Sequence, residues 1–206
     1  QGGNRPALHW LPVSLKSSHM EQYTTPLPST LVDELDQFWQ TIPELTTNER
    51  WRRELLGLDP SPNRLRVYLE RRAGQIVASC QLWISRRLPC LAEFTYPATT
   101  PPFRNQGIAH ALWSAAMADA AAAGVEAIFL GTFYPDALRS YRRLGFSKLP
   151  ASTTFLKALD GRSAEEFLVD WFRGVGPVRI SPGDGHDQLP SYPLLVLPHD
   201  WQVLDA

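Results

Sequence analysis

The stretch TTPPFRNQGIAHALWSAAM, residues 99–117, runs through two prolines, an arginine and a glycine into an alanine-rich helix. Its key positions are Arg104, Gly107 and Ala109. The first turn of a helix leaves several backbone N–H groups unpaired and carries the positive end of the helix dipole. Gly107 would let a ligand approach that backbone closely, and Ala109 would keep the next turn thin. The pattern indicates a helix N-terminus suited to an anion. An ordinary helix start, with Gly107 only relieving a turn, is the alternative.

Composition and charge limit the kind of protein. The chain has 206 residues, 44% of them hydrophobic, which suits one domain with a sizeable appendage. With 20 basic and 21 acidic residues the net charge is −1, so the basic surplus typical of nucleic-acid binders is missing. The longest apolar runs are shorter than the ~20 residues of a membrane span. We therefore expect neither nucleic acid nor a membrane as a partner.

Cysteine and histidine usage bears on location and metals. Cys80 and Cys90 form no metal-binding pair and are too few for a disulfide-stapled secreted fold, and no signal peptide opens the sequence. The cytoplasm is therefore the expected location. Asp184, His186 and Asp187 in SPGDGHDQ are metal-ligand types, but a solvated turn explains this segment fully. We expect no metal site.

Hydrophobic periodicity predicts the elements of the first half. Residues 7–15 read as a short strand, and helices follow the capping patterns Thr30-x-x-Asp33 and Thr46-x-x-Glu49. Alternating residues on both sides of the turn RRAGQ predict a β-hairpin over residues 65–84. A third strand, over residues 91–99, leads into the stretch quoted above.

The second half alternates helices and strands. The helix over residues 107–123 stops at Gly124, and the apolar run at 125–133 predicts a strand covered on both faces. Pro135 opens another helix that ends at Gly145, and two final strands complete the series by residue 159. The fold class is therefore α/β, a mixed sheet with an antiparallel front half and one β-α-β crossover.

The remainder, residues 160–206, has a different pattern. Ser163-x-x-Glu166 predicts a capped helix, and the apolar run YPLLVLP at 192–198 predicts a strand after a Pro/Gly-rich loop. We expect this helix-strand extension to pack on the main domain, because it is too small for a core of its own. It then either walls a substrate pocket or simply covers a sheet face or a homodimer contact.

The element order and two motifs resemble the GNAT superfamily, the Gcn5-related N-acetyltransferases. These motifs are Arg104-x-x-Gly107-x-Ala109 at a strand-to-helix junction and YRRLGF, residues 141–146, at the end of a later helix. An Ala-Glu pair ending at Glu93, eleven residues before Arg104, is similar to the histone-acetylating branch. The resemblance covers residues 8–159. It implies a central twisted mixed sheet with helices on both faces, and transfer of an acetyl group from acetyl-coenzyme A to an amine.

The resemblance also implies the site residues. Tyr141 matches the family position that protonates the leaving thiolate, although core packing alone would also explain it. Glu93 is the expected general base, with a structural ion pair or a surface position as the alternative. The implied cofactor-binding residues are Ala98, Thr99, Arg104, Asn105, Gln106, Gly107, Ile108, Ala109 and Tyr134.

Two departures from the family pattern leave a second function open. Relatives often have Asn where this chain has Tyr134, and Pro97 lacks an N–H in the strand whose amides usually contact the pantetheine arm. The alternative is a catalytically weak or inactive module that binds acyl-CoA. The sequence contains no phosphate-binding P-loop, no dinucleotide fingerprint and no nucleophile elbow. The acceptor stays open between a small amine, a peptide N-terminus and a lysine side chain.

Overall fold

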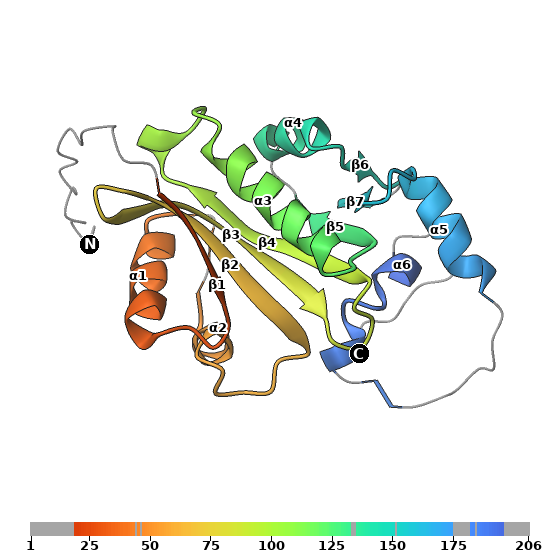
Figure 1. Cartoon of the computed structure of the whole chain (residues 1–206), viewed down its shortest axis with the longest axis horizontal. Helices are drawn as coiled ribbons and strands as arrows, with labels where there is room; N and C mark the ends of the chain where they lie inside the picture. Colours follow the sequence, from red (N-terminus) through yellow and green to blue (C-terminus); the bar gives the residue numbers. More distant parts are fainter. Residues whose placement is uncertain are drawn as a thin grey trace, which may run out of the picture.

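The computed structural model describes residues 19–43, 45, 47–132, 135–150, 152–174, 182–183 and 185–195. They build a seven-stranded sheet with the order β1-β2-β3-β4-β5-β7-β6 (Figure 1). The strands are β1 (His19–Thr24), β2 (Asn63–Arg72), β3 (Gln75–Ser85), β4 (Leu91–Thr99), β5 (Ala127–Gly131), β6 (Ser147–Lys148) and β7 (Thr154–Ala158). The helices are α1 (Ser29–Gln40), α2 (Glu49–Leu55), α3 (Ile108–Ala122), α4 (Pro135–Arg143), α5 (Ala164–Arg173) and α6 (Tyr192–Leu195), with 3-10 turns η1 (Pro101–Phe103) and η2 (Gly185–Asp187).

Strand pairing confirms the predicted mixed sheet. Neighbouring strands pair antiparallel except β4 and β5, which run parallel and are joined by the crossover helix α3. The β2–β3 hairpin turns at Ala73 and Gly74, with φ of 46° and 81°. Two successive residues of positive φ match the twist of the flanking strands, so the turn is tight.

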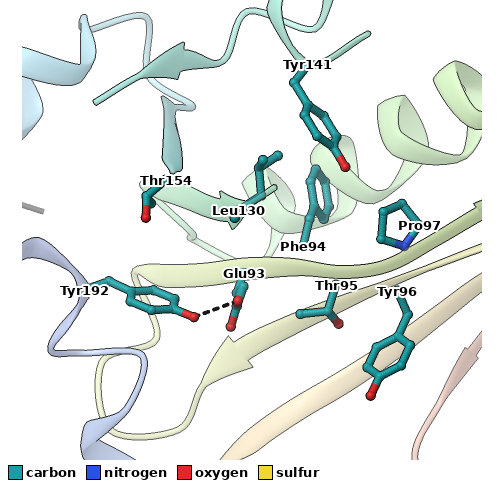
Figure 2. Close-up of a pocket in the computed structure, with 10 residues that line it drawn as sticks. Glu93, Phe94, Thr95, Tyr96, Pro97, Leu130, Tyr141, Thr154 and Tyr192 are labelled. Atoms are coloured by element: carbon teal, nitrogen blue, oxygen red, sulfur yellow. Dashed lines mark hydrogen bonds between the residues drawn. The ribbon is translucent and has the colours of Figure 1, made fainter. Parts of the chain in front are cut away.

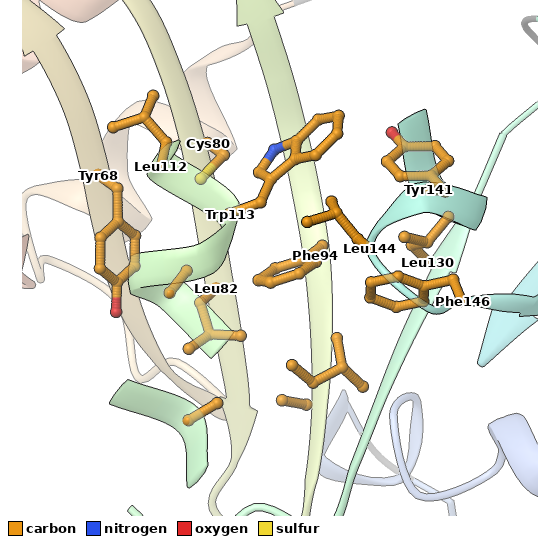
Figure 3. Packing of buried hydrophobic residues seen from close by; sticks show 14 of the residues in the cluster. Tyr68, Cys80, Leu82, Phe94, Leu112, Trp113, Leu130, Tyr141, Leu144 and Phe146 are labelled. Atoms are coloured by element: carbon orange, nitrogen blue, oxygen red, sulfur yellow. The ribbon is translucent and has the colours of Figure 1, made fainter. Parts of the chain in front are cut away.

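Helices α3 and α4 cover one face of the sheet. Figure 3 shows Leu112 and Trp113 of α3 packing over side chains of β2, β3 and β4, with Tyr141 of α4 and Leu144, which follows α4, beside them. The strands contribute Tyr68, Cys80, Leu82, Phe94 and Leu130, among others. This cluster is the largest of the three in the described core, and the buried side chains of α3, the helix that follows the glycine motif, belong to it.

Two separate groups of elements cover the opposite face. Helices α1 and α2 pack over β2 and β3, where the rings of Trp39 and Trp51 meet edge to face with centroids 4.3 Å apart. Over β4, β5 and β7 lies the C-terminal extension, whose buried Phe167 and Leu189 join a cluster with Phe129. Trp83 packs against both groups, which places them on the same face.

The start of the chain and the helix caps differ from the sequence-based expectations. The strand predicted at residues 7–15 lies outside the described residues and stays a prediction. The first observed strand, β1, was missed because its mostly exposed residues give no apolar alternation. Helix α1 begins at Ser29 after Pro28, with no side-chain cap, so Thr30 lies inside its first turn. Asn48 rather than Thr46 caps α2, accepting a hydrogen bond from the Trp51 N–H.

The extension agrees with the sequence at its start and differs at its end. The capping box of Ser163 and Glu166 is confirmed at the N-terminus of α5. Residues 192–195 form a short helix instead of a strand, because local turns satisfy their backbone: the Leu194 N–H donates to the Ser191 carbonyl. The rest of that predicted strand, 196–198, lies outside the described residues.

Candidate active site

Strands β4 and β5 separate partway along β4. Their parallel ladder runs from the pair Leu91–Ala127 to the pair Glu93–Phe129 and ends there, while β4 continues to Thr99. Beyond Glu93, the β5 side of β4 therefore offers main-chain groups that no strand of this ladder pairs. A cavity of about 250 Å³ lies at the split. It is lined by Glu93, Phe94, Thr95, Tyr96, Pro97, Leu130, Gly131, Tyr141, Thr154 and Tyr192 (Figure 2).

The cavity is lined from both faces of the sheet. Successive side chains of a strand point to opposite faces, so Phe94 points away from its neighbours Glu93 and Thr95. In Figure 2, Phe94 and Tyr141 lie on one side of the β4 ribbon, whereas Glu93 and Tyr192 lie on the other. Groups on the α3–α4 face and on the extension's face therefore meet at one opening.

A β-bulge shapes the floor of the cavity. Gln81 of β3 pairs with Thr95, and Ser79 pairs with Ala98, so β4 has one residue more than β3 in this interval. Tyr96 takes up the extra length with φ of 48°, a left-handed conformation that tyrosine rarely adopts. Such bulges often lie beside functional sites, where they redirect a side chain or end regular pairing.

The two strand amides predicted to bind the cofactor differ in orientation. The Thr100 N–H donates to the Val77 carbonyl (2.9 Å), so the main chain of Thr100 faces β3. Residues of an antiparallel ladder alternate between facing the partner and facing away. Ala98 therefore faces β3 like Thr100, whereas the Thr99 main chain faces the open side. Of the two, Thr99 is the amide that a ligand can reach.

The N-terminus of α3 has the open backbone that the sequence indicates. Gly107 is the N-cap residue with φ of 78°, no side chain caps the helix, and a Cβ placed on Gly107 would meet nothing within 4 Å. Asn105 also has positive φ (61°), and residues 104–107 are exposed. The Arg104 Nε donates to the Thr99 carbonyl (3.0 Å), which ties this loop to the end of β4. Ile108 and Ala109 anchor the first turn against the core.

Tyr141 is held rigidly at the cavity. Its side chain is 4% exposed and packs against Trp113, with ring centroids 5.0 Å apart, and against Phe146 and Phe155. Figure 2 shows its hydroxyl directed toward β4, beside Phe94. Burial raises the pKa of the phenol above its ordinary value of 10. The hydroxyl therefore stays protonated and can act as a proton donor.

Glu93 lies on the opposite side of the opening. It accepts a hydrogen bond from the Tyr192 hydroxyl at Oε1 (2.7 Å), shown dashed in Figure 2. Burial raises the pKa of Glu93 from its ordinary 4.5 to about 7, while this hydrogen bond opposes the rise. A carboxyl with a pKa near neutrality is suited to accept a proton during catalysis.

The structure thus brings some of the predicted residues together. Glu93 and Tyr141 line the same cavity, and Thr99 contacts the Arg104 loop. Tyr134 lies outside the described residues. Sequence reasoning missed Tyr192, because it lies in a segment read as a strand and no local motif marks it. In the described part of the chain, no group of three or more His, Cys, Asp or Glu side chains could hold a metal ion.

The comparisons with known proteins agree with this architecture. The profile of the family described as "Acetyltransferase (GNAT) family" matches residues 19–146. The chain belongs to the GNAT acetyltransferase family. No curated protein matches it significantly. Among the helices described, none is both long and apolar enough to cross a membrane.

Solved structures show the same fold at low sequence identity. A GNAT acetyltransferase from Staphylococcus aureus Mu50 is 16% identical with a TM-score of 0.55, over 69% of this chain and 99% of the other. Ard1 from Thermoplasma volcanium is 16% identical with a TM-score of 0.52, over 68% and 97%. An N-acetyltransferase from Staphylococcus aureus Mu50 is 10% identical with a TM-score of 0.52, over 70% and 99%. At these identities the likeness shows the fold alone.

Proposed function

We propose that the protein is an N-acetyltransferase that moves an acetyl group from acetyl-CoA to a primary amine by direct attack. The observation that carries this proposal is the cavity at the β4–β5 split, which Tyr141 lines from one face of the sheet and Glu93 from the other. A base and an acid on opposite sides of one opening match a reaction in which one proton leaves the amine and another reaches the thiolate.

The loop before α3 fits the pyrophosphate of coenzyme A. The free N–H groups of the first helical turn and the helix dipole favour an anion, and Gly107 leaves open space where a side chain would stand. Arg104 adds a positive charge at the same place, and the exposed residues Asn105 and Gln106 add backbone N–H groups. The open side of β4 beyond Glu93 suits an extended, amide-bearing arm that leads from this loop to the cavity.

Each reacting group then has a partner in the chain. Acetyl-CoA supplies a thioester, whose carbonyl carbon bonds to the amine nitrogen as its carbon–sulfur bond breaks. Glu93 takes the proton that the amine loses, and Tyr141 gives its proton to the departing sulfur. The Thr99 N–H is the strand amide available to the arm that leads to the cavity, because Pro97 has none and Ala98 faces β3.

The acceptor is proposed only as a primary amine. The residues on the extension's side of the cavity are one carboxyl and several hydroxyls, and none of the ten lining residues is Lys, Arg or His. This environment accommodates an amine that arrives as a cation. We also propose a cytoplasmic location, where acetyl-CoA is made available and where the two free thiols, Cys80 and Cys90, stay reduced.

Release of free thiol from acetyl-CoA tests the proposal. The protein is incubated with acetyl-CoA and a panel of small amines, peptides with free N-termini and lysine peptides, and products are identified by mass spectrometry. We expect thiol release that depends on one class of amine. Stabilisation by CoA without thiol release from any amine would favour the alternative, an acyl-CoA-binding module without chemistry.

A further inference from the structure

The C-terminal extension places one side chain directly on the candidate base. Tyr192 lies 99 residues from Glu93 in sequence, yet its hydroxyl donates to Glu93 Oε1 at 2.7 Å and its ring lines the cavity. The ring also packs against Phe129 of β5, with centroids 5.6 Å apart. Phe129 pairs with Glu93 in the β4–β5 ladder. Tyr192 therefore contacts both strands at the point where they part.

The described part of the extension that precedes Tyr192 is anchored to the main domain at several points. Leu189 is 2% exposed and joins the cluster of Leu91, Phe129 and Phe167. Arg87, in the β3–β4 loop, forms an ion pair with Asp187. The start of α5 is held by Arg162, which bridges Glu126, Asp160 and Asp170.

Tyr192 is the group in the surroundings of Glu93 that hydrogen-bonds to its carboxylate. The titratable groups that line the cavity with Glu93 are Tyr192 of α6, Tyr141 of α4 and Tyr96 of β4. The other elements at this point contribute uncharged groups: Leu130 and Gly131 of β5, Thr154 of β7, and Trp83 of β3, which pairs with Glu93 of β4. Among the described residues, Tyr192 is the hydrogen-bond partner of Glu93, which leaves Oε2 for a substrate.

We propose that Tyr192 is a positioning residue of this site, whose hydroxyl orients the Glu93 carboxylate toward the acceptor amine, so that the site is complete only when the extension is seated. This inference rests on the proposed function. A carboxylate that accepts a hydrogen bond at one oxygen has its orientation fixed and its ionised form favoured. Besides covering the sheet, the extension then sets the pH above which the Glu93 carboxyl is ionised and can accept a proton.

The substitution Tyr192→Phe tests this role, because it keeps the ring on Phe129 and removes only the hydroxyl. We expect the acidic limb of the kcat/KM profile to move up by about one pH unit, which gives about a tenfold loss of rate below the limb. The matched control is Tyr23→Phe, which removes an equivalent bond from a tyrosine hydroxyl to Glu21 (2.8 Å) on the far edge strand β1. The control should leave the limb in place.

A second measurement separates this inference from the proposed function. The Glu93 carboxyl is titrated by carbon NMR, without substrate, in the wild type and in Tyr192→Phe. A higher Glu93 pKa in the variant supports the coupling, and equal pKa values overturn it. An acidic limb that stays in place, with only the melting temperature lowered, would also overturn it and assign Tyr192 to packing alone. Absence of thiol release from the wild type would count against the proposed function, while the titration still decides on Tyr192.

Discussion

The proposed phosphate site and the Glu93 side of the cavity are built from very different lengths of chain. On the α3–α4 face, the proposed phosphate site is contiguous, from Arg104 to Ala109, and its geometry comes from one loop and one helix start. On the other face, Glu93 meets Tyr192 from 99 residues away, held there by the packing of α5 and the segment around Leu189. One side is a local motif and the other is an assembly.

This difference has consequences for how each side fails. A local site depends on backbone conformation at one or two positions, so a single substitution there should remove binding without unfolding the protein. An assembled site depends on a separate part of the chain being seated. Variants on that side should change the pH profile and the rate while cofactor binding persists. The following predictions test this contrast.

The largest effect is expected for Gly107→Val. Valine tolerates the φ of 78° poorly, and its side chain would project into the open space before α3. Wild-type protein at 100 times the Kd of CoA should gain about 2.7 kcal/mol of stability, and the variant should gain almost none. Thermal unfolding with and without CoA measures this difference.

Gly124→Val is the matched control for that experiment. Gly124 follows the other end of α3, has φ of 82° and likewise has nothing within 4 Å of an added Cβ. Both variants pay a similar backbone cost, of about 1–3 kcal/mol. Only Gly107→Val should lose the response to CoA; an intact response in both would remove the phosphate-site interpretation.

Tyr141→Phe should affect chemistry rather than binding. The ring contacts with Trp113, Phe146 and Phe155 are kept, and only the hydroxyl at the cavity is lost. If Tyr141 protonates the thiolate, kcat falls by roughly 10- to 1000-fold, while stabilisation by CoA is unchanged. Steady-state thiol release and thermal unfolding report the two quantities. A kcat equal to that of the wild type would assign Tyr141 to the core alone.

Glu93→Gln should lower the activity and raise the stability of the protein, and the gain in stability should depend on pH. Because the fold raises the pKa of Glu93 from 4.5 to about 7, the folded state favours the protonated carboxyl. The stability it contributes is full below pH 4.5 and is lost as the pH rises through about 7. Glutamine mimics the protonated form at every pH, so the variant should be more stable by about 1–3 kcal/mol at pH 8 and nearly equal at pH 4.

Chemical denaturation at the two pH values, combined with rate profiles, checks this prediction. Activity of Glu93→Gln should fall and lose its acidic limb. An equal stability difference at pH 4 and pH 8 would show that Glu93 does not titrate near neutrality. An unchanged acidic limb in the rate profile of the variant would show that Glu93 is not the base, and would assign removal of the amine proton to water.

The sequence predicted the parts of this molecule that depend on local chemistry. The element order from α1 to β7, the hairpin at Ala73 and Gly74, the capping box at Ser163 and the end of α3 at Gly124 are confirmed. Each of these features follows from the types of residues that are close together in the sequence. The stripe of apolar residues on α1 is buried as its spacing requires.

The sequence could not predict features that depend on distant partners. Pro97 in FTYPAT is compatible with a bulge, because proline inside a sheet occurs at edges and bulges, but the position of the bulge depends on the pairing of β4 with β3. Tyr192 reaches Glu93 through the tertiary packing of α5 and Leu189, which no periodicity within residues 185–195 reveals. The identity of Glu93 as a base was proposed from the family resemblance, but its raised pKa depends on burial that only the fold provides.

A crystal structure of the protein with bound coenzyme A tests the central claim most directly. We expect the pyrophosphate within hydrogen-bond distance of the backbone N–H groups at residues 105–109. We also expect the sulfur in the cavity at the β4–β5 split, near the Tyr141 hydroxyl, with Glu93 and Tyr192 on the opposite side of the opening. Coenzyme A bound at another surface, or a sulfur remote from both Tyr141 and Glu93, would contradict it.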